Sequence, residues 1–148
     1  MRAYGIDLHD SVVPPGGFRS FNDFFVRAVR PSARPFDPDP DALASPADGR
    51  LFLVENLRPD VAFAVKGTSF RLAGLLGDIE SAKGFDGGIA AIFRLAPGDC
   101  HRLYFPCDGR TCAHRRVSGA YYSVTPFPGN DRPFYSLNQR TVSLFESE

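Results

Sequence analysis

The sequence predicts an α+β fold that is mainly β, a distorted β-sandwich or barrel with short N-terminal helices. The chain has 148 residues, a length that suits one domain. Its 14 glycines and 13 prolines divide it into short segments, which disfavours a helical bundle. Most apolar runs between these residues have the length of strands, and the helix signals concentrate near the start. We expect residues 1–17 to form an N-terminal segment and 18–148 the domain, incomplete at its C-terminus.

The N-terminal segment ends in the breaker cluster Pro14-Pro15-Gly16-Gly17, and a short helix is predicted after it. Ser20 with Asp23 three residues later forms a capping pattern. Pro31 is expected to stop the helix, because its ring disfavours helical geometry in the preceding residue. The apolar face of this helix is either core or a membrane-facing surface, and it carries Phe21, Phe24, Phe25, Ala28 and Val29.

After an extended Pro-Asp connector, the remaining elements are mostly strands. Ser69 is expected to cap a short helix that runs through Leu76. The Asp108-Gly109 pair predicts a hairpin between the strands on either side of it. A bulge is expected near Ser118-Gly119. The predicted strands are 50–54, 61–65, 89–95, 101–105, 111–124 and 140–145.

Net charge, cysteine number and the lengths of apolar runs limit the partners and the compartment that we expect for this protein. The formal net charge is zero, which gives no support to a nucleic-acid partner. Three cysteines are an odd number and do not suggest a disulfide framework, so a reducing, cytoplasmic compartment is expected. The first ten residues have no apolar run typical of a signal peptide, and no stretch has the roughly 18 apolar residues of a membrane span. Any membrane contact is therefore expected to be peripheral.

Reactive side chains cluster around residues 99–114. Asp99 and His101 lie two apart, so an extended strand would place both on one face for acid–base chemistry. The three cysteines with two histidines could instead hold zinc, although their spacing lacks the usual C-x2-C pairs, and no metal is our expectation. They could also be buried groups of the core. The cluster comprises Asp99, Cys100, His101, Cys107, Cys112 and His114.

A second candidate is Asp48, in the turn-forming sequence Pro46-Ala47-Asp48-Gly49. An aspartate in such a turn usually accepts hydrogen bonds from its own backbone. The residue types alone leave open whether Asp48 closes the turn or acts in a site.

The order of the motifs carries further information. A series of short sequence blocks follows in order from about residue 18 to the C-terminus, and together these blocks resemble the phosphatidylserine decarboxylase family. Each block alone is a weak signal, whereas the series in register is specific. The blocks are Phe21-Asn22-Asp23-Phe24-Phe25-Val26-Arg27, Arg34-Pro35, Ser45-Pro46-Ala47-Asp48-Gly49, Val65-Lys66-Gly67 with Phe70 and Leu75-Leu76-Gly77, Asp99-Cys100-His101-Arg102 with Pro106-Cys107-Asp108-Gly109, and Asn138-Gln139-Arg140 with Leu144-Phe145.

The resemblance implies a pyruvoyl-dependent lyase of phospholipid synthesis that converts phosphatidylserine into phosphatidylethanolamine at a membrane surface. The precursor of such an enzyme cuts itself at a Gly-Ser bond, and the serine becomes the pyruvoyl group, an electron sink, on a smaller C-terminal chain. By position, Asp48 matches the aspartate that assists self-cleavage. Asp99 matches a second acidic residue, and His101 a histidine that positions the substrate carboxylate and assists protonation. Phe21, Phe24 and Phe25 are candidates for membrane or substrate contact.

Two departures from the family pattern stand out. Tyr104 occupies the position of a second histidine, the base for self-cleavage, and a phenol is a poorer base than imidazole at neutral pH. His114 is a candidate replacement. No Gly-Ser pair occurs in the 148 residues, so we expect this chain alone not to form the pyruvoyl group and to be inactive. The chain is then either a part of an enzyme completed by a second chain, or a non-catalytic relative that binds phospholipid or a partner.

Overall fold

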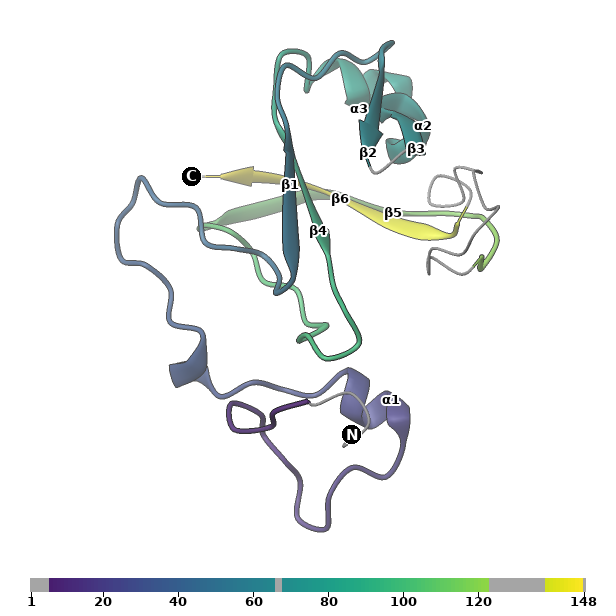
Figure 1. Cartoon of the computed structure of the whole chain (residues 1–148). Helices are drawn as coiled ribbons and strands as arrows, with labels where there is room; N and C mark the ends of the chain where they lie inside the picture. The colour runs from purple at the N-terminus through teal and green to yellow at the C-terminus, as the bar shows by residue number, and fades with distance from the viewer. Residues whose placement is uncertain (1–5, 66–67, 123–137, 148) are drawn as a thin grey trace. The chain divides into compact units, whose positions relative to one another are not determined.

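A computed structural model describes residues 6–65, 68–122 and 138–147 (Figure 1). Its internal contacts divide the chain into two compact units, which are considered separately below. Unit 1 comprises residues 1–51 and 92–108, and unit 2 comprises residues 52–91 and 109–148. The predicted 126–133 loop lies outside the described residues.

Helices are few and short, and strands predominate, so the predicted α+β class is confirmed. The described residues form three two-stranded sheets, β1 with β4, β2 with β3 and β5 with β6, and no closed barrel. The elements are α1 (Phe21–Phe25), η2 (Pro31–Ala33), β1 (Arg50–Val54), β2 (Ala62–Val65), β3 (Thr68–Arg71), α2 (Leu72–Leu76), α3 (Ile79–Lys83), β4 (Ala90–Arg94), β5 (Gly109–Val117) and β6 (Arg140–Ser147).

The first helix of unit 1 begins as predicted and ends early. The Ser20 side chain accepts a hydrogen bond from the Asp23 N–H at 3.0 Å, which confirms the cap. The helix ends at Phe25, well before Pro31, so the predicted length was wrong. The reason is a non-local contact: the carbonyl of Ala28 accepts a hydrogen bond from Val12 N–H at 2.9 Å. This pairing with the N-terminal segment withdraws Ala28 from the helix.

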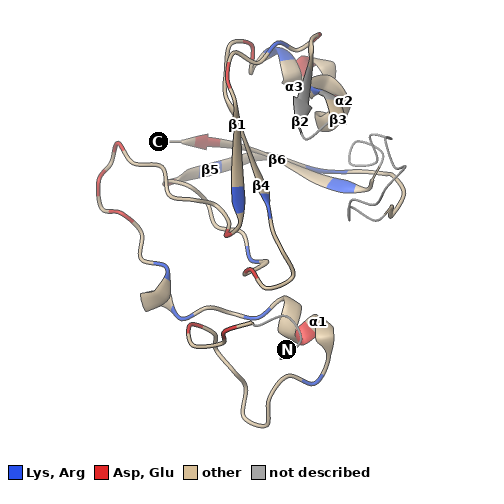
Figure 2. Ribbon diagram, viewed as in Figure 1, with Lys and Arg blue, Asp and Glu red and all other residues tan. Residues whose placement is uncertain are grey.

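The segment between η2 and β1 is extended, as its alternating prolines and aspartates predict. Figure 2 shows acidic positions recurring along it. Each of two aspartates accepts a hydrogen bond from a backbone N–H two residues later, Asp37 from Asp39 at 3.0 Å and Asp39 from Asp41 at 2.9 Å. These local turns replace a helix or strand. The connector therefore reaches Asp48 without regular structure.

Several strand predictions required correction. Residues 101–105 form no ladder; instead the Tyr104 N–H donates to the carbonyl of Pro46 at 2.9 Å. Asp108-Gly109 forms no hairpin, because Gly109 begins β5, whose antiparallel partner is the distant strand β6. The predicted 111–124 strand is shorter and ends at Val117. Its irregularity lies between Thr111 and Ala113 rather than near residue 118.

Unit 2 is organised around α2. Its core consists of Leu57, Leu72 and Ala82. Ser69 lies in β3 and does not cap α2, so the predicted cap was wrong. The helix ends at Leu76 and is capped by Gly77, whose left-handed conformation (φ +68°) favours glycine.

Two arginines from β5 and β6 satisfy the carbonyl groups at the end of α2. Arg140 donates through Nε to the carbonyl of Leu75 at 2.6 Å and through Nη2 to that of Gly74. Arg115 donates through Nη2 to the carbonyl of Leu76 at 2.8 Å. Carbonyl groups of a last helical turn have no partner within the helix, and cations there also interact favourably with the negative end of the helix dipole. These contacts attach the β5–β6 pair to α2.

Asp78 caps α3, and its charge predicts a pH-dependent stability. Its carboxylate accepts hydrogen bonds from the Ser81 hydroxyl and the Ser81 N–H, and these contacts lower the pKa of Asp78 to about 2. Because the folded pKa is depressed, the stabilisation is present above the ordinary value of 3.8 and is lost as pH falls toward 2.

We therefore expect Asp78→Asn to lower the free energy of unfolding at pH 6 and to have a clearly smaller effect at pH 2.5, where part of the stabilisation is already lost. Urea denaturation between these pH values measures the difference. Asp60→Asn, at an exposed position of the same unit, is the control. An Asp78→Asn effect that stays constant across this range contradicts the assignment.

Candidate active site

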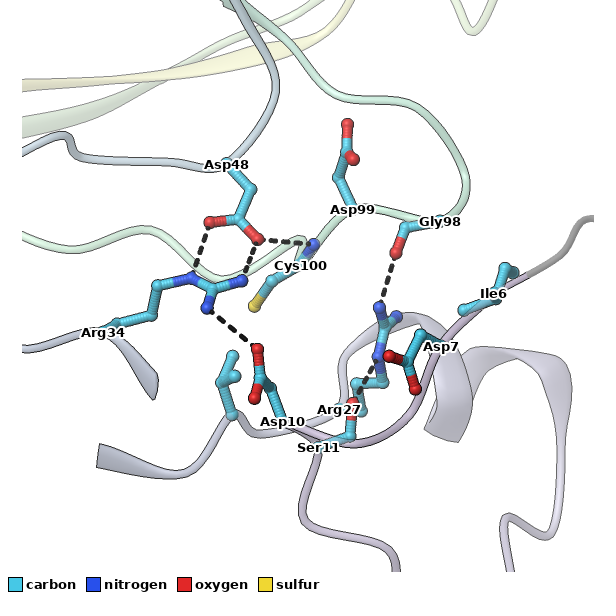
Figure 3. Close-up of a pocket in the computed structure, with 11 residues that line it drawn as sticks. Ile6, Asp7, Asp10, Ser11, Arg27, Arg34, Asp48, Gly98, Asp99 and Cys100 are labelled. Carbon is cyan, nitrogen blue, oxygen red and sulfur yellow. Dashed lines mark hydrogen bonds and ion pairs between the residues drawn. The ribbon is translucent and has the colours of Figure 1, made fainter. Parts of the chain in front are cut away.

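The carboxylate of Asp48 is held by a forked ion pair within unit 1. Arg34 Nε donates to Asp48 Oδ1 at 3.0 Å, and Arg34 Nη2 donates to Asp48 Oδ2 at 2.8 Å (Figure 3). The turn itself is closed by Ser45, whose hydroxyl donates to the carbonyl of Ala47 at 2.8 Å. The side chain of Asp48 is thus directed to a residue 14 positions earlier in the chain. A two-point contact of this kind fixes both the position and the plane of a carboxylate.

The environment of Asp48 favours its ionised form. The Arg34 guanidinium is the largest influence and lowers the pKa of Asp48, and the Cys100 N–H at 3.4 Å from Oδ2 acts in the same direction. Partial burial opposes both, since it disfavours charge. The same ion pair raises the pKa of Arg34. Asp48 is accordingly a carboxylate, not a proton donor, at neutral pH.

The N-terminal segment contributes Asp10 to this arrangement. Arg34 Nη1 lies 3.4 Å from Asp10 Oδ2, so one guanidinium joins two carboxylates. His9 Nδ1 lies 3.1 Å from Asp10 Oδ1 and is the largest influence that lowers the pKa of Asp10. Sequence reasoning found Arg34 only as part of a motif and missed Asp10, for which the sequence offers no motif.

Arg27 is a buried cation in unit 1, with 7% of its surface exposed. Its Nη2 donates to the carbonyl of Gly98 at 2.6 Å and its Nε to the hydroxyl of buried Ser11 at 3.2 Å. Its guanidinium also lies 4.5 Å from the centroid of the Phe24 ring. Carbonyl, hydroxyl and ring contacts of this kind replace the lost solvation of a buried charge. Arg27 therefore joins α1, the N-terminal segment and the loop before Asp99.

A cavity of about 310 Å³ opens beside these residues. Its lining combines carboxylates with the two guanidinium groups of Arg27 and Arg34, so the cavity is polar and contains groups of both charges (Figure 3). The four acidic residues in the lining are Asp7, Asp10, Asp48 and Asp99.

Asp99 and His101 do not share one face of a strand, because residues 99–101 are not in a strand. Each of the two side chains contacts the backbone of Ala96 instead. Asp99 Oδ2 accepts a hydrogen bond from the Ala96 N–H at 2.6 Å. His101 Nε2 donates to the carbonyl of Ala96 at 3.1 Å when it carries the ring proton. The imidazole stacks on Phe25 with ring centroids 3.7 Å apart. Both side chains are therefore anchored on the loop at Ala96, and Asp99 points away from the Arg34–Asp48 pair (Figure 3).

The remaining predicted positions lie in separate surroundings. Tyr104 meets Phe36 edge to face, with ring centroids 6.3 Å apart. His114 lies in unit 2, on β5, where its Nδ1 is 2.9 Å from the Ser143 hydroxyl. All three cysteines are free thiols, and within residues 6–65, 68–122 and 138–147 no three His, Cys, Asp or Glu side chains gather as metal ligands.

The three phenylalanines of α1 differ in exposure. Phe24 is buried and packs edge to face against Phe18 at 5.7 Å. Phe25 is half-buried beneath His101, whereas Phe21 is 67% exposed. In the part of the chain that the structure describes, no helix has the length and apolar character needed to cross a membrane.

The chain thus has an α+β fold and an aspartate that an arginine holds in a Ser-Pro-Ala-Asp-Gly turn. Comparison with known sequences shows which family of proteins it belongs to. The phosphatidylserine decarboxylase family model matches residues 21–148. The chain belongs to this family. The match includes Asp48, Asp99, His101 and Tyr104, so all four are positions of the family domain.

Relatives from several bacteria support this membership. A phosphatidylserine decarboxylase proenzyme of Clostridium novyi is 40% identical over 146 residues, which cover 98% of this chain and 50% of the relative. Its counterpart from Bordetella pertussis is 38% identical over 151 residues, which cover 100% of this chain and 51% of the relative. The chain thus spans about half the length of the curated relatives it matches.

Proposed function

We propose that this chain takes part in the decarboxylation of phosphatidylserine to phosphatidylethanolamine, as the portion of a carboxy-lyase that contains Asp48, Asp99 and His101. The observation that carries the proposal is the family match along residues 21–148, within which Asp48 is an ionised carboxylate on a polar cavity. Cavity groups of both charges suit a head group that has an ammonium, a carboxylate and a phosphate.

The 148 residues do not contain the sequence from which the pyruvoyl group of this family usually forms. Its usual source is the serine of a Gly-Ser pair, and the 148 residues contain no such pair. We propose that a second polypeptide segment supplies the group, and that residues 1–148 alone release no CO2 from phosphatidylserine.

The side chains present suggest distinct roles. Asp48 remains charged and can accept a hydrogen bond from a cationic group that enters the cavity. His101, when its Nε2 donates to Ala96, leaves Nδ1 able to accept a proton and to return it, which suits a general acid–base role. Asp99 is occupied by the Ala96 N–H, so we propose that it shapes the loop that presents His101.

A chimera tests the proposed function. Residues 1–148 replace the matched half of the Clostridium novyi relative, and carboxyl-labelled phosphatidylserine is offered in detergent micelles. We expect labelled CO2 from the chimera above the background of residues 1–148 alone. Absence of release from the chimera, both with Tyr104 and with Tyr104→His, overturns the proposal.

A second candidate function is non-catalytic binding of an amino-phospholipid, and Tyr104 favours it. The family has a histidine at this position, and tyrosine is a weak substitute as a base. In this case the chimera carrying Tyr104 binds vesicles of phosphatidylserine without releasing CO2. Binding that does not change when phosphatidylserine is replaced by phosphatidylcholine contradicts this candidate.

We propose peripheral membrane contact through Phe21, the exposed aromatic residue of α1. Because Phe24 is buried, Phe24→Asp would disturb folding. Phe21 is mostly exposed, and only one side of its ring faces Phe24 and Phe25, with ring centroids 5.9 and 5.8 Å away. We expect Phe21→Asp to lower flotation of the chain with phosphatidylserine vesicles several-fold. Leu43→Asp, an exposed apolar position in the connector of the same unit, is the control. Equal flotation of the two variants contradicts the proposed contact.

A further inference from the structure

We propose that Arg34 is the positioning residue of Asp48, holding its carboxylate in one orientation and coupling it to the N-terminal segment through Asp10. The inference deepens the proposed function, on which it rests only for the importance of Asp48. The geometry itself concerns two side chains and can be tested without substrate.

The contact has the geometry that only arginine provides. Nε and Nη2 of Arg34 approach the two different oxygens of Asp48 at 3.0 and 2.8 Å. Such a fork prevents rotation of the carboxylate about its last bond, whereas the single ammonium of a lysine would allow it. The Cys100 N–H at 3.4 Å adds a third contact on Oδ2.

Arg34 is itself held in place. Its Nη1 lies 3.4 Å from Asp10 Oδ2 and donates to the carbonyl of Ala33 at 2.7 Å. Every nitrogen of the guanidinium is therefore engaged, although 41% of the side chain remains exposed. Exposed ion pairs usually contribute little to stability, so the effect of this pair is expected in the orientation and charge of Asp48 more than in folding.

The charged groups around Asp48 act in opposite directions. Arg34 and, more weakly, Arg27 favour its ionised form, while Asp10 and Asp99 line the same cavity with like charge. A carboxylate offers about four acceptor positions, and the contacts above use three. One position is left for a donor that enters the cavity, so Arg34 determines the direction from which that donor approaches.

Nuclear magnetic resonance of the folded chain with ¹³C-labelled aspartate tests the proposal. The Asp48 carboxyl signal is followed from pH 2 to 7 in the unchanged chain and in Arg34→Gln, Arg34→Lys and Arg19→Gln. Arg19 is a matched control, because no hydrogen-bond or ion-pair partner for it exists among the described residues of the chain. The Cys100 amide signal reports orientation, since that N–H donates to Asp48.

Arg34→Gln is expected to raise the pKa of Asp48 toward its ordinary value and to abolish the titration seen at the Cys100 amide. Arg34→Lys is expected to restore the pKa in part but not the amide titration, because it returns the charge without the fork. Arg19→Gln is expected to change neither. If Arg34→Gln does not fold, Arg34→Lys alone decides through the Cys100 amide.

Two results would overturn the proposal. In one, Asp48 titrates in Arg34→Gln as it does in Arg19→Gln. In the other, Arg34→Lys leaves the Cys100 amide titration unchanged, so that the fork is not what orients the carboxylate. Neither result bears on decarboxylation, which the chimera measures separately, so the two proposals fail independently.

Discussion

Tyr104→His is expected to raise the rate of self-cleavage of the chimera with the Clostridium novyi relative by about 10²–10⁴, the usual contribution of a positioned general base. The substitution places an imidazole where the resemblance to the family implies one. Imidazole accepts a proton from a serine hydroxyl at neutral pH far more readily than a phenol does. The rate is measured by the appearance of two fragments on a denaturing gel after synthesis.

The control for this prediction is Tyr104→Phe, which removes the hydroxyl and keeps the ring that meets Phe36. We expect Tyr104→Phe to cleave no faster than the chimera carrying Tyr104. Equal rates for the histidine and phenylalanine variants would contradict a role for this position as a base. Adding His114→Ala to the chimera carrying Tyr104 then tests whether His114 acts in its place, because removal of a substitute base would reduce any cleavage that this chimera shows.

Gly49→Ala is expected to be among the most destabilising single substitutions in unit 1. Gly49 has φ +118°, a conformation that favours glycine, and a Cβ atom there would lie 2.5 Å from the carbonyl oxygen of Arg94. Backbone strain of this kind costs about 1–3 kcal/mol, and the overlap with backbone atoms adds to it. Because Asp48 is the preceding residue, relief of the overlap would also displace its carboxylate from Arg34.

Thermal unfolding and the Asp48 titration together measure the effect of Gly49→Ala. The matched control is Gly74→Ala, because Gly74 lies within α2 and a Cβ atom there would have no neighbour within 4 Å. Alanine favours a helix by about 0.5–1 kcal/mol over glycine, so the control is expected to be neutral or stabilising. A Gly49→Ala chain as stable as the control, with an unchanged Asp48 pKa, contradicts the close approach at Arg94.

Local signals predicted local structure well in this chain. The Ser20 cap of α1 and the start and end of β1 follow from residue types within a few positions. The ordered motifs predicted the family, since each block keeps its place in the series.

Non-local pairing was predicted poorly, for a physical reason. The Asp108-Gly109 pair has the composition of a hairpin turn, yet β5 pairs with β6, about thirty residues further on. The choice of strand partner depends on packing between distant segments, which turn composition does not encode. The early end of α1 has the same origin, because the partner of Ala28 is Val12 in the N-terminal segment.

In the candidate site, too, the local features were predicted from the sequence and the contacts between distant residues were not. Asp48 could be predicted as a candidate from its turn and motif. Its ion pair with Arg34 could not, because the irregular segment between the two residues has no periodic pattern that would indicate which side chains meet. Asp10 and the buried state of Arg27 depend on how the N-terminal segment packs on α1. Side-chain partners of this kind become visible only in three dimensions, and they determine the charge of the aspartate.

The most direct test of the central claim, that Asp48 serves a phosphatidylserine decarboxylase, is the release of labelled CO2 by the chimera carrying Tyr104→His, with and without Asp48→Asn. Asparagine keeps the size of the side chain and removes the charge that Arg34 holds. We expect release from the Tyr104→His chimera and its loss, together with self-cleavage, in the Asp48→Asn form. Equal release from both forms, or none from either, would contradict the claim.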